Sequence, residues 1–192
     1  MAAPTSRFRL IPNDTAVADI DTAAERLAAI ADQSVVSTGD GNEADFGTVD
    51  ISGGAANSSV LTLLWDITAD GGNTTIEDFL LWMNSNGFDQ AGSVCKFQPL
   101  SGDDQESPSD TENYIVNAVV GSYTWATMPE AEPEAQNVYP SDEGSSMALS
   151  TTSDDVIMWA MYLAIAASET TGTYKGTDSG YELQFSFKYS YS

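Results

Sequence analysis

The final stretch, Tyr181-Glu182-Leu183-Gln184-Phe185-Ser186-Phe187-Lys188-Tyr189-Ser190-Tyr191-Ser192, alternates without interruption between apolar and polar side chains. Strict alternation is the pattern of a β-strand with one buried face. We expect the odd-numbered face, with one leucine and five aromatic residues, to be buried, and the even-numbered face to be polar. At about 3.3 Å per residue such a strand spans about 40 Å, which suits a sandwich or a sheet shared between subunits.

Further strand patterns occur in the chain before this segment. We expect strands at residues 60–67, 75–83, 93–98, 114–125 and 155–166. The 155–166 segment is apolar on both faces, as in a strand buried on each side, although a buried helix shows the same pattern. The 75–83 segment also fits a helical spacing, but Gly-rich turns on both sides favour a strand.

About seven to nine short strands that do not alternate with helices predict two packed antiparallel sheets. We therefore predict an all-β fold, a jelly-roll-like antiparallel β-sandwich over residues 19–192, preceded by an extended N-terminal arm at residues 1–18. One short helix is expected at residues 19–33, where apolar residues recur at helical spacing. The acidic loops at 99–113 and 128–146 are not expected to pack in the core.

The chain is strongly acidic, with 29 acidic against 6 basic residues and a formal net charge of −23. This charge disfavours binding to nucleic acid or to an anionic membrane. It keeps copies soluble and mutually repelled unless salt or divalent cations screen them. A salty or open environment explains such a charge, and so does plain solubility. We expect no secretory signal and no transmembrane span, because no apolar run of suitable length occurs.

The residues needed for several kinds of catalysis are missing. The chain has no histidine and a single cysteine, Cys95. His-based triads, His general bases and Cys/His zinc sites are thereby excluded. Cys95 lies in an apolar stretch and is expected to be a small buried hydrophobe. We expect Trp65, Trp82 and Trp159 in the core, whereas Trp125 borders a loop and is the candidate for an exposed ring.

Carboxylate chemistry remains open. Glycan hydrolysis needs only two carboxyl groups about 5–10 Å apart, but most acidic residues here lie in polar loops, so we expect no enzyme and assign no catalytic residue. Asp40, Asn42 and Asp45 offer the oxygen ligands that Ca²⁺ prefers, without EF-hand spacing; an ordinary acidic turn is the alternative. No other cofactor is expected. Glycan sequons begin at Asn13, Asn57 and Asn73, a number that chance explains.

The N-terminal segment suggests an assembly contact. The residues concerned are Arg7, Phe8, Arg9 and Leu10, which are strand-like and have no acidic neighbour between residues 1 and 12. A basic strand on an acidic body predicts docking on the sheet edge of a neighbour, as in β-augmentation. Two alternatives are a frayed terminus and an arm that folds back on its own body.

The turn at residues 172–176 and the alternating strand after it resemble the last hairpin of surface β-sandwich modules, such as fimbrial subunits, spore-coat proteins and phage virion proteins. Residues 65–79 look like sandwich domains of tailed-phage accessory proteins. The resemblance implies a homo-oligomer or a partner of a major capsid protein, located in a virion or an extracellular assembly. It implies a capsid-decoration, cement or fibre role. The alternatives are a subunit of an extracellular filament or surface layer, and a carbohydrate-binding or glycan-hydrolysing domain with a possible glycan contact.

Overall fold

The computed structural model describes residues 2–11, 35–36, 44–99, 125–138, 146–149, 155–172 and 183–192, and these ranges contain strands and no helix. Three predicted features lie wholly or mostly outside them: the helix at 19–33, the acidic loop at 99–113 and the strand at 114–125.

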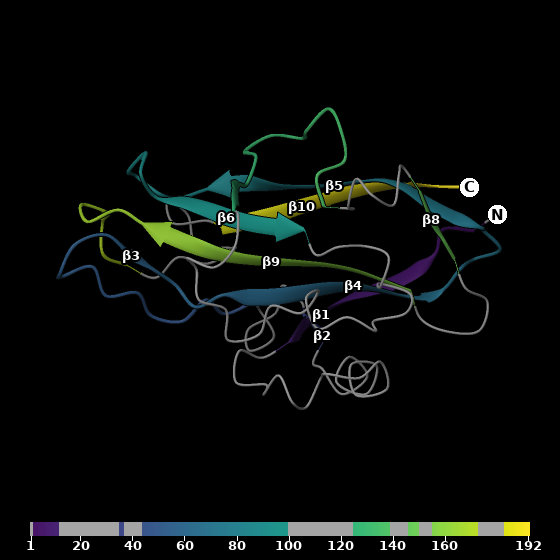
Figure 1. Ribbon diagram of the computed structural model, residues 1–192, viewed down its shortest axis with the longest axis horizontal. Helices are drawn as coiled ribbons and strands as arrows, with labels where there is room; N and C mark the ends of the chain where they lie inside the picture. Colours follow the sequence, from purple (N-terminus) through teal and green to yellow (C-terminus); the bar gives the residue numbers. More distant parts are fainter. Residues whose placement is uncertain are drawn as a thin grey trace.

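Two antiparallel sheets face each other, with β5 and β10 in one layer and β9, β4 and β1 in the other (Figure 1). Sheet A has seven strands in the order β2-β1-β4-β9-β6-β7, with β3 also paired to β9. Its strands are β1 (Thr5–Ile11), β2 (Val35–Val36), β3 (Ala56–Asn57), β4 (Leu61–Ala69), β6 (Val94–Pro99), β7 (Ala126–Thr127) and β9 (Asp155–Ile165). Sheet B has three strands in the order β10-β5-β8, namely β10 (Leu183–Tyr191), β5 (Thr75–Asn86) and β8 (Ser146–Ala148).

The predicted all-β antiparallel sandwich is thereby confirmed, because every described strand pair is antiparallel. The segment 155–166 forms strand β9 at the centre of sheet A and not a helix. Both faces of β9 are buried, as expected, with Trp159 on the side of the core and Ala160 and Tyr162 on the other side. The jelly-roll connectivity stays a prediction.

The core lies between the sheets and is built from alternate residues of β4 and β9. Trp65 of β4 and Trp159 of β9 are 0% and 2% exposed. Phe79 of β5 lies between them, with its ring centroid 5.0 Å from that of Trp65 and 5.9 Å from that of Trp159. Burial of each such side chain contributes about 2–3 kcal/mol, so these rings are a main link between the layers.

A β-bulge in β5 explains why its sequence also fits a helical spacing. The register with β10 moves from Leu80↔Lys188 to Glu77↔Ser190, so β5 has one residue more than its partner there. Asp78, within this step, has a φ of 53°, which is the left-handed region. Because of the extra residue, Ile76 and Phe79 both face the core although they are three positions apart.

The expected burial of the odd-numbered face of β10 is confirmed only in part. Leu183, Phe185 and Tyr189 are half-buried and pack against the core. Phe187 and Tyr191, in contrast, are 39% and 43% exposed. The reason is topological: β10 is the edge strand of sheet B, and no described strand continues the sheet over these two rings.

The expectation that the loop at 128–146 stays outside the core is wrong for its described part. Met128 and Val138 are 2% and 0% exposed. The segment is held along β5, where Met83 N donates to Pro129 O (2.8 Å). The side chain of Asn137 accepts from Leu81 N (2.9 Å) and donates to Leu81 O (2.7 Å). The Asn137 side-chain amide thus makes the hydrogen bonds that a neighbouring strand would make. Pro129 lacks an N–H, but it can lie beside β5 because it contributes only its carbonyl oxygen.

Two of the four tryptophans lie elsewhere than in the core. Trp82 was expected there but is half-buried on the opposite face of β5, because it alternates with the buried Leu81 and Met83. Trp125, the candidate for an exposed ring, is half-buried and meets Tyr162 edge to face at 4.9 Å.

The turn between β4 and β5 connects the two sheets. Gly71 and Gly72 have φ of 67° and 82°, and Asn73 N donates to Asp70 O at 3.1 Å. Positive φ at both central residues is the requirement of a type I′ turn, which favours glycine.

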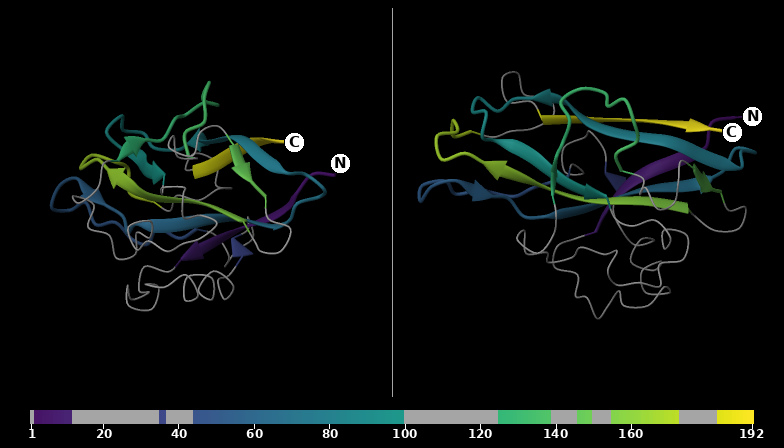
Figure 2. Two further views of the ribbon diagram at one scale, coloured as in Figure 1. Left: turned by 45° about the vertical axis from the view of Figure 1, so that its right-hand side comes forward. Right: turned by 45° about the horizontal axis from the view of Figure 1, so that its top comes forward.

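Both ends of the described chain attach to this turn, and both views of Figure 2 show them at the same end of the molecule. Asn73 Nδ2 donates to Ala2 O at 2.8 Å, and Ser192 O accepts from Thr74 N at 2.6 Å. Asn73 is only 3% exposed, so its side chain is not accessible for glycosylation in the folded protein. Asn57, at the start of a second sequon, is exposed.

Gly71→Ala should destabilise the protein more than Gly72→Ala. A Cβ at position 71 would lie 2.5 Å from Ala2 O, whereas one at position 72 would meet no atom within 4 Å. Both changes place alanine at positive φ, at a cost of about 1 kcal/mol. We expect an additional loss of about 1 kcal/mol for Gly71→Ala in urea unfolding. Equal losses would show that the N-terminal residues do not rest on the turn.

Asn137→Ala should reduce the free energy of unfolding by about 2–4 kcal/mol, because it leaves the N–H and C=O of Leu81 without their side-chain partners. The matched control is Glu134→Ala, which changes an exposed residue of the same segment and should cost no more than about 0.5 kcal/mol. Denaturant melts of both variants test this. A loss for Asn137→Ala as small as that of the control would contradict the assigned role.

Candidate functional site

The edge of β10 that faces away from β5 is the most unusual surface of the described chain. β10 pairs with β5, and no other described strand pairs with it. Phe187 and Tyr191 are the exposed large hydrophobic side chains of the described residues. An open strand edge next to exposed aromatic rings is a template for adding another strand.

Aromatic side chains of sheet A contact the rings of Phe187 and Tyr189. The Phe187 and Phe8 rings meet edge to face at 4.6 Å, and the Tyr189 ring lies 4.5 Å from that of Trp65. Burial raises the pKa of the Tyr189 hydroxyl, the neighbouring Tyr191 raises it further, and a hydrogen bond with Ser6 acts in the opposite direction. Tyr189 is therefore neutral at physiological pH, and the edge keeps an apolar character.

Strands β1 and β10 differ in charge from the rest of the chain, although Arg9 is only 4% exposed and lies with Arg7 on the face of β1 opposite the core-facing Phe8 and Leu10. β1 and β10 together contain three of the six basic residues, Arg7, Arg9 and Lys188, and none of the 29 acidic ones. Lys188 lies on the outer face of sheet B, where its Nζ is 2.5 Å from Glu132 Oε1. Both side chains are about half exposed, so this ion pair contributes little to stability.

The predicted assembly arm is part of sheet A. Its residues are Arg7, Phe8, Arg9 and Leu10, and they belong to β1. Phe8 pairs with Trp65 and Leu10 with Leu63 of β4, so their side chains pack against the core. Residues 5–11 therefore follow the fold-back alternative and are not a free arm. The physical reason is that the alternation of Phe8 and Leu10 matches the inner face of β4. Residues 12–18 lie outside the described ranges.

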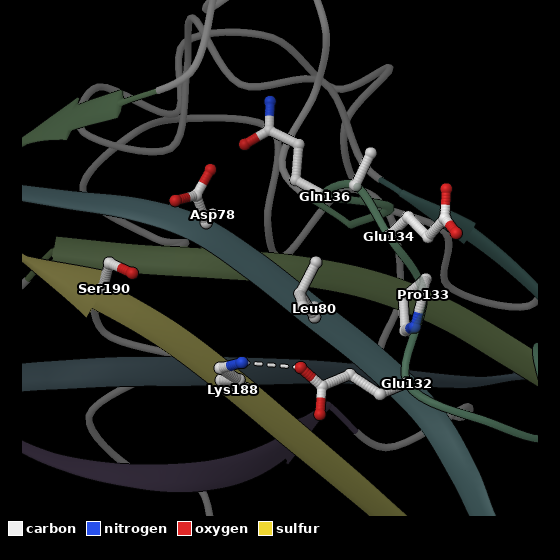
Figure 3. A pocket seen from close by; sticks show the side chains of 9 residues that line it. Asp78, Leu80, Glu132, Pro133, Glu134, Gln136, Lys188 and Ser190 are labelled. Atoms are coloured by element: carbon white, nitrogen blue, oxygen red, sulfur yellow. Dashed lines mark hydrogen bonds and ion pairs between the residues drawn. The ribbon is translucent and has the colours of Figure 1, made fainter.

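A hollow of about 460 Å³ lies on the outer face of sheet B, between β5, β10 and the segment 132–136 (Figure 3). Its lining consists of Asp78, Leu80, Glu132, Pro133, Glu134, Ala135, Gln136, Lys188 and Ser190. Three of these residues are carboxylates, and one of them, Glu132, forms the ion pair with Lys188. No aromatic ring is among the lining residues described, whereas ligand pockets usually present aromatic or apolar walls. The hollow thus gives the glycan-binding alternative little support, and the hydrolytic alternative stays untested.

The calcium expectation stays a prediction. Asp40 and Asn42 lie outside the described residues. Asp45 is exposed, and its Oδ1 accepts a hydrogen bond from Gly47 N at 2.8 Å, as in an ordinary Asx turn. Across the described ranges, no group of three or more potential metal-binding side chains is gathered together.

A buried carboxylate that the sequence analysis missed has a structural role. Glu169 is 5% exposed, and its oxygens accept from Asp89 N (3.0 Å) and Gln90 N (3.3 Å). The hydroxyl of Thr170 is the main cause that lowers the pKa of the Asp89 carboxyl. These contacts tie the chain after β9 to the β5–β6 loop. No sequence signal distinguishes Glu169 from the exposed acidic residues.

Cys95 is 0% exposed on the inner face of β6, which confirms the prediction that it is a small buried hydrophobe. Its burial raises the pKa of the thiol to about 12. The thiol is therefore protonated and unreactive in the folded protein.

Comparisons with known proteins give no relative, since no family model, curated protein or solved structure matches this chain. Within the described ranges there is also no helix with the length and hydropathy of a transmembrane span.

Iodoacetamide should label Cys95 very slowly in the native protein at pH 8, where a thiol of this pKa is ionised to on the order of 10⁻⁴. Labelling should become fast in urea, because unfolding removes the burial. The control is a Cys95→Ala/Ala55→Cys variant, whose thiol replaces an exposed side chain and should react in the native state. Mass spectrometry follows both reactions, and equal native rates would contradict the placement of Cys95.

Proposed function

We propose that this protein is a structural subunit of a virus particle, acting as a capsid-decoration, cement or related accessory protein through protein–protein contacts. The observation that carries the proposal is the β10 edge, which presents Phe187 and Tyr191 on a strand without a described outer neighbour. Aromatic side chains at an open strand edge favour association with another chain. The resemblance of the last hairpin to phage virion sandwich modules points in the same direction.

The rest of the described chain is consistent with a structural role in which the protein only makes contacts with other proteins. The fold is an antiparallel sandwich with one hydrophobic core, and the side chains of the half-buried Asn137 and the buried Ser58 form hydrogen bonds with backbone groups. Ser58, for example, accepts from Leu163 N at 2.8 Å. The charge of −23 keeps free copies soluble before they assemble, and ions screen it in the assembled state. A filament or surface-layer subunit would use the same edge and is the second candidate.

The test is whether the protein is found on particles. Antibodies against the purified chain should label virus particles by immunogold electron microscopy, and the protein should co-sediment with them in a density gradient. Labelled filaments or a labelled surface layer would favour the second candidate. A stable monomer that is absent from all of these and binds or cleaves glycans would contradict the proposal.

A further inference from the structure

The chain contains a single Asn-Gly step, at Asn86-Gly87, and every other asparagine is followed by a residue with a side chain. Asparagine is one of the thermolabile residues, because the backbone nitrogen of the next residue can attack its side-chain amide. Glycine has no Cβ, so its nitrogen is the least hindered nucleophile and its backbone is the most easily rotated. The sequence thus distinguishes Asn86 from the other asparagines as a position for covalent change.

The structure places this step where the reaction has room. Asn86 is the last residue of β5 and pairs with Leu183 of β10, and Gly87 lies beyond the end of the strand. Both Asn86 and Gly87 are half-buried, so water reaches them. Two other asparagines differ: Asn73 is itself 3% exposed, and Asn137 is followed by the fully buried, β-branched Val138.

Two hydrogen bonds hold the Asn86 side chain. Its Oδ1 accepts from Phe88 N at 3.1 Å, which forms an Asx turn that encloses Gly87. The same N–H donor draws electron density from the amide carbon Cγ and would stabilise negative charge on Oδ1 during an attack. The nitrogen that would leave, Nδ2, donates to Glu130 Oε1 at 2.6 Å. The turn therefore folds the side-chain amide over the peptide whose nitrogen is the nucleophile.

We propose that Asn86 is a deamidation site of the folded protein. Solvent base removes the proton from Gly87 N, and this nitrogen attacks Cγ of Asn86. The new C–N bond closes a succinimide ring, while Nδ2 takes up a proton and leaves as ammonia. Water then adds to one of the two ring carbonyls and breaks its bond to the ring nitrogen, which leaves aspartate or isoaspartate at position 86. No electrons are transferred, and water is the only co-reactant.

The product changes the contact with Glu130. The amide that donates to Glu130 is replaced by a second carboxylate, so a hydrogen bond is lost and two like charges face each other. Glu130 directly follows Pro129, whose carbonyl oxygen accepts from Met83 N at 2.8 Å. Deamidation should therefore loosen this end of the segment 129–138 from β5, while Asn137 still holds the other end.

The first test follows every asparagine of the full chain by peptide mapping and mass spectrometry during incubation in mildly alkaline buffer. We expect Asn86 to convert at least about tenfold faster than Asn84, an exposed asparagine that is followed by serine. Gly87→Ala should slow the conversion by at least about tenfold, because a Cβ hinders the attack. The matched control is Gly53→Ala, whose Cβ would meet no atom within 4 Å and which should leave the conversion of Asn86 unchanged.

The second test measures amide hydrogen exchange at Met83 by NMR, since this amide reports the attachment of Pro129. Asn86→Asp reproduces the aspartate product and should speed the exchange by at least about threefold. Asn84→Asp adds the same charge on an exposed side chain of the same strand and should have no effect. The double variant Asn86→Asp/Glu130→Gln should restore slow exchange, because the glutamine amide can donate to the new aspartate. Circular dichroism melts show whether all variants fold.

The site would be refuted by conversion of Asn86 that is more than about tenfold slower in the folded chain than in the chain unfolded by urea, because the fold would then protect the amide. Equal rates for the Gly87→Ala variant and the wild type would also refute it. The structural consequence would be refuted by equal exchange of Met83 in Asn86→Asp and Asn84→Asp, or by a double variant that exchanges as fast as Asn86→Asp. None of these outcomes depends on the proposed function.

Discussion

The contact of Phe79 with Trp65 and Trp159 is the interaction on which the rest of the structure depends, since it joins sheet B to two central strands of sheet A. Phe79 reaches this position only because the bulge at Asp78 shifts the alternation of β5 by one residue. Without the shift, either Ile76 or Phe79 would point away from the core. The free-energy cost of the left-handed φ at Asp78 is thus offset by the burial of the Phe79 side chain.

The same arrangement leaves β10 without a neighbour on its outer side among the described strands. β5 lies over the middle of sheet A. One edge of β5 pairs with β8 and, further along, with the side chain of Asn137, and the other edge pairs with β10. Sheet A has more strands than the described part of sheet B, so the outer rim of sheet A has no described layer above it. Phe187 and Tyr191 stand at this rim. Their exposure is a consequence of the unequal sheets, and a protein that assembles can use it without loss of its own core.

The parts of the fold that follow from simple alternation were predictable from the sequence. β4, β9 and β10 were located within a few residues, because a period of two is visible without knowledge of their partners. The bulge at Asp78 and the strand-like role of Asn137 were not, because both depend on contacts between distant segments. The candidate site was half predictable: the basic, apolar character of residues 7–10 was visible and fold-back of the arm was one alternative, but the contact of Phe8 with Phe187 of β10 was not foreseen. Edge position is a property of topology and leaves no local signal in β10.

The central claim is that the outer side of β10, which has no neighbour among the described strands, is the surface through which we propose that the protein assembles. Hydrogen–deuterium exchange of peptides from residues 183–192, compared between free and assembled protein, tests it most directly. We predict that about half of the β10 amides, those pointing away from β5, exchange rapidly in the free chain and become protected on assembly. Peptides from β4 and β9 should be protected equally in both states. Full protection of β10 in the free chain, or assembly-dependent protection elsewhere but not in β10, would contradict the account.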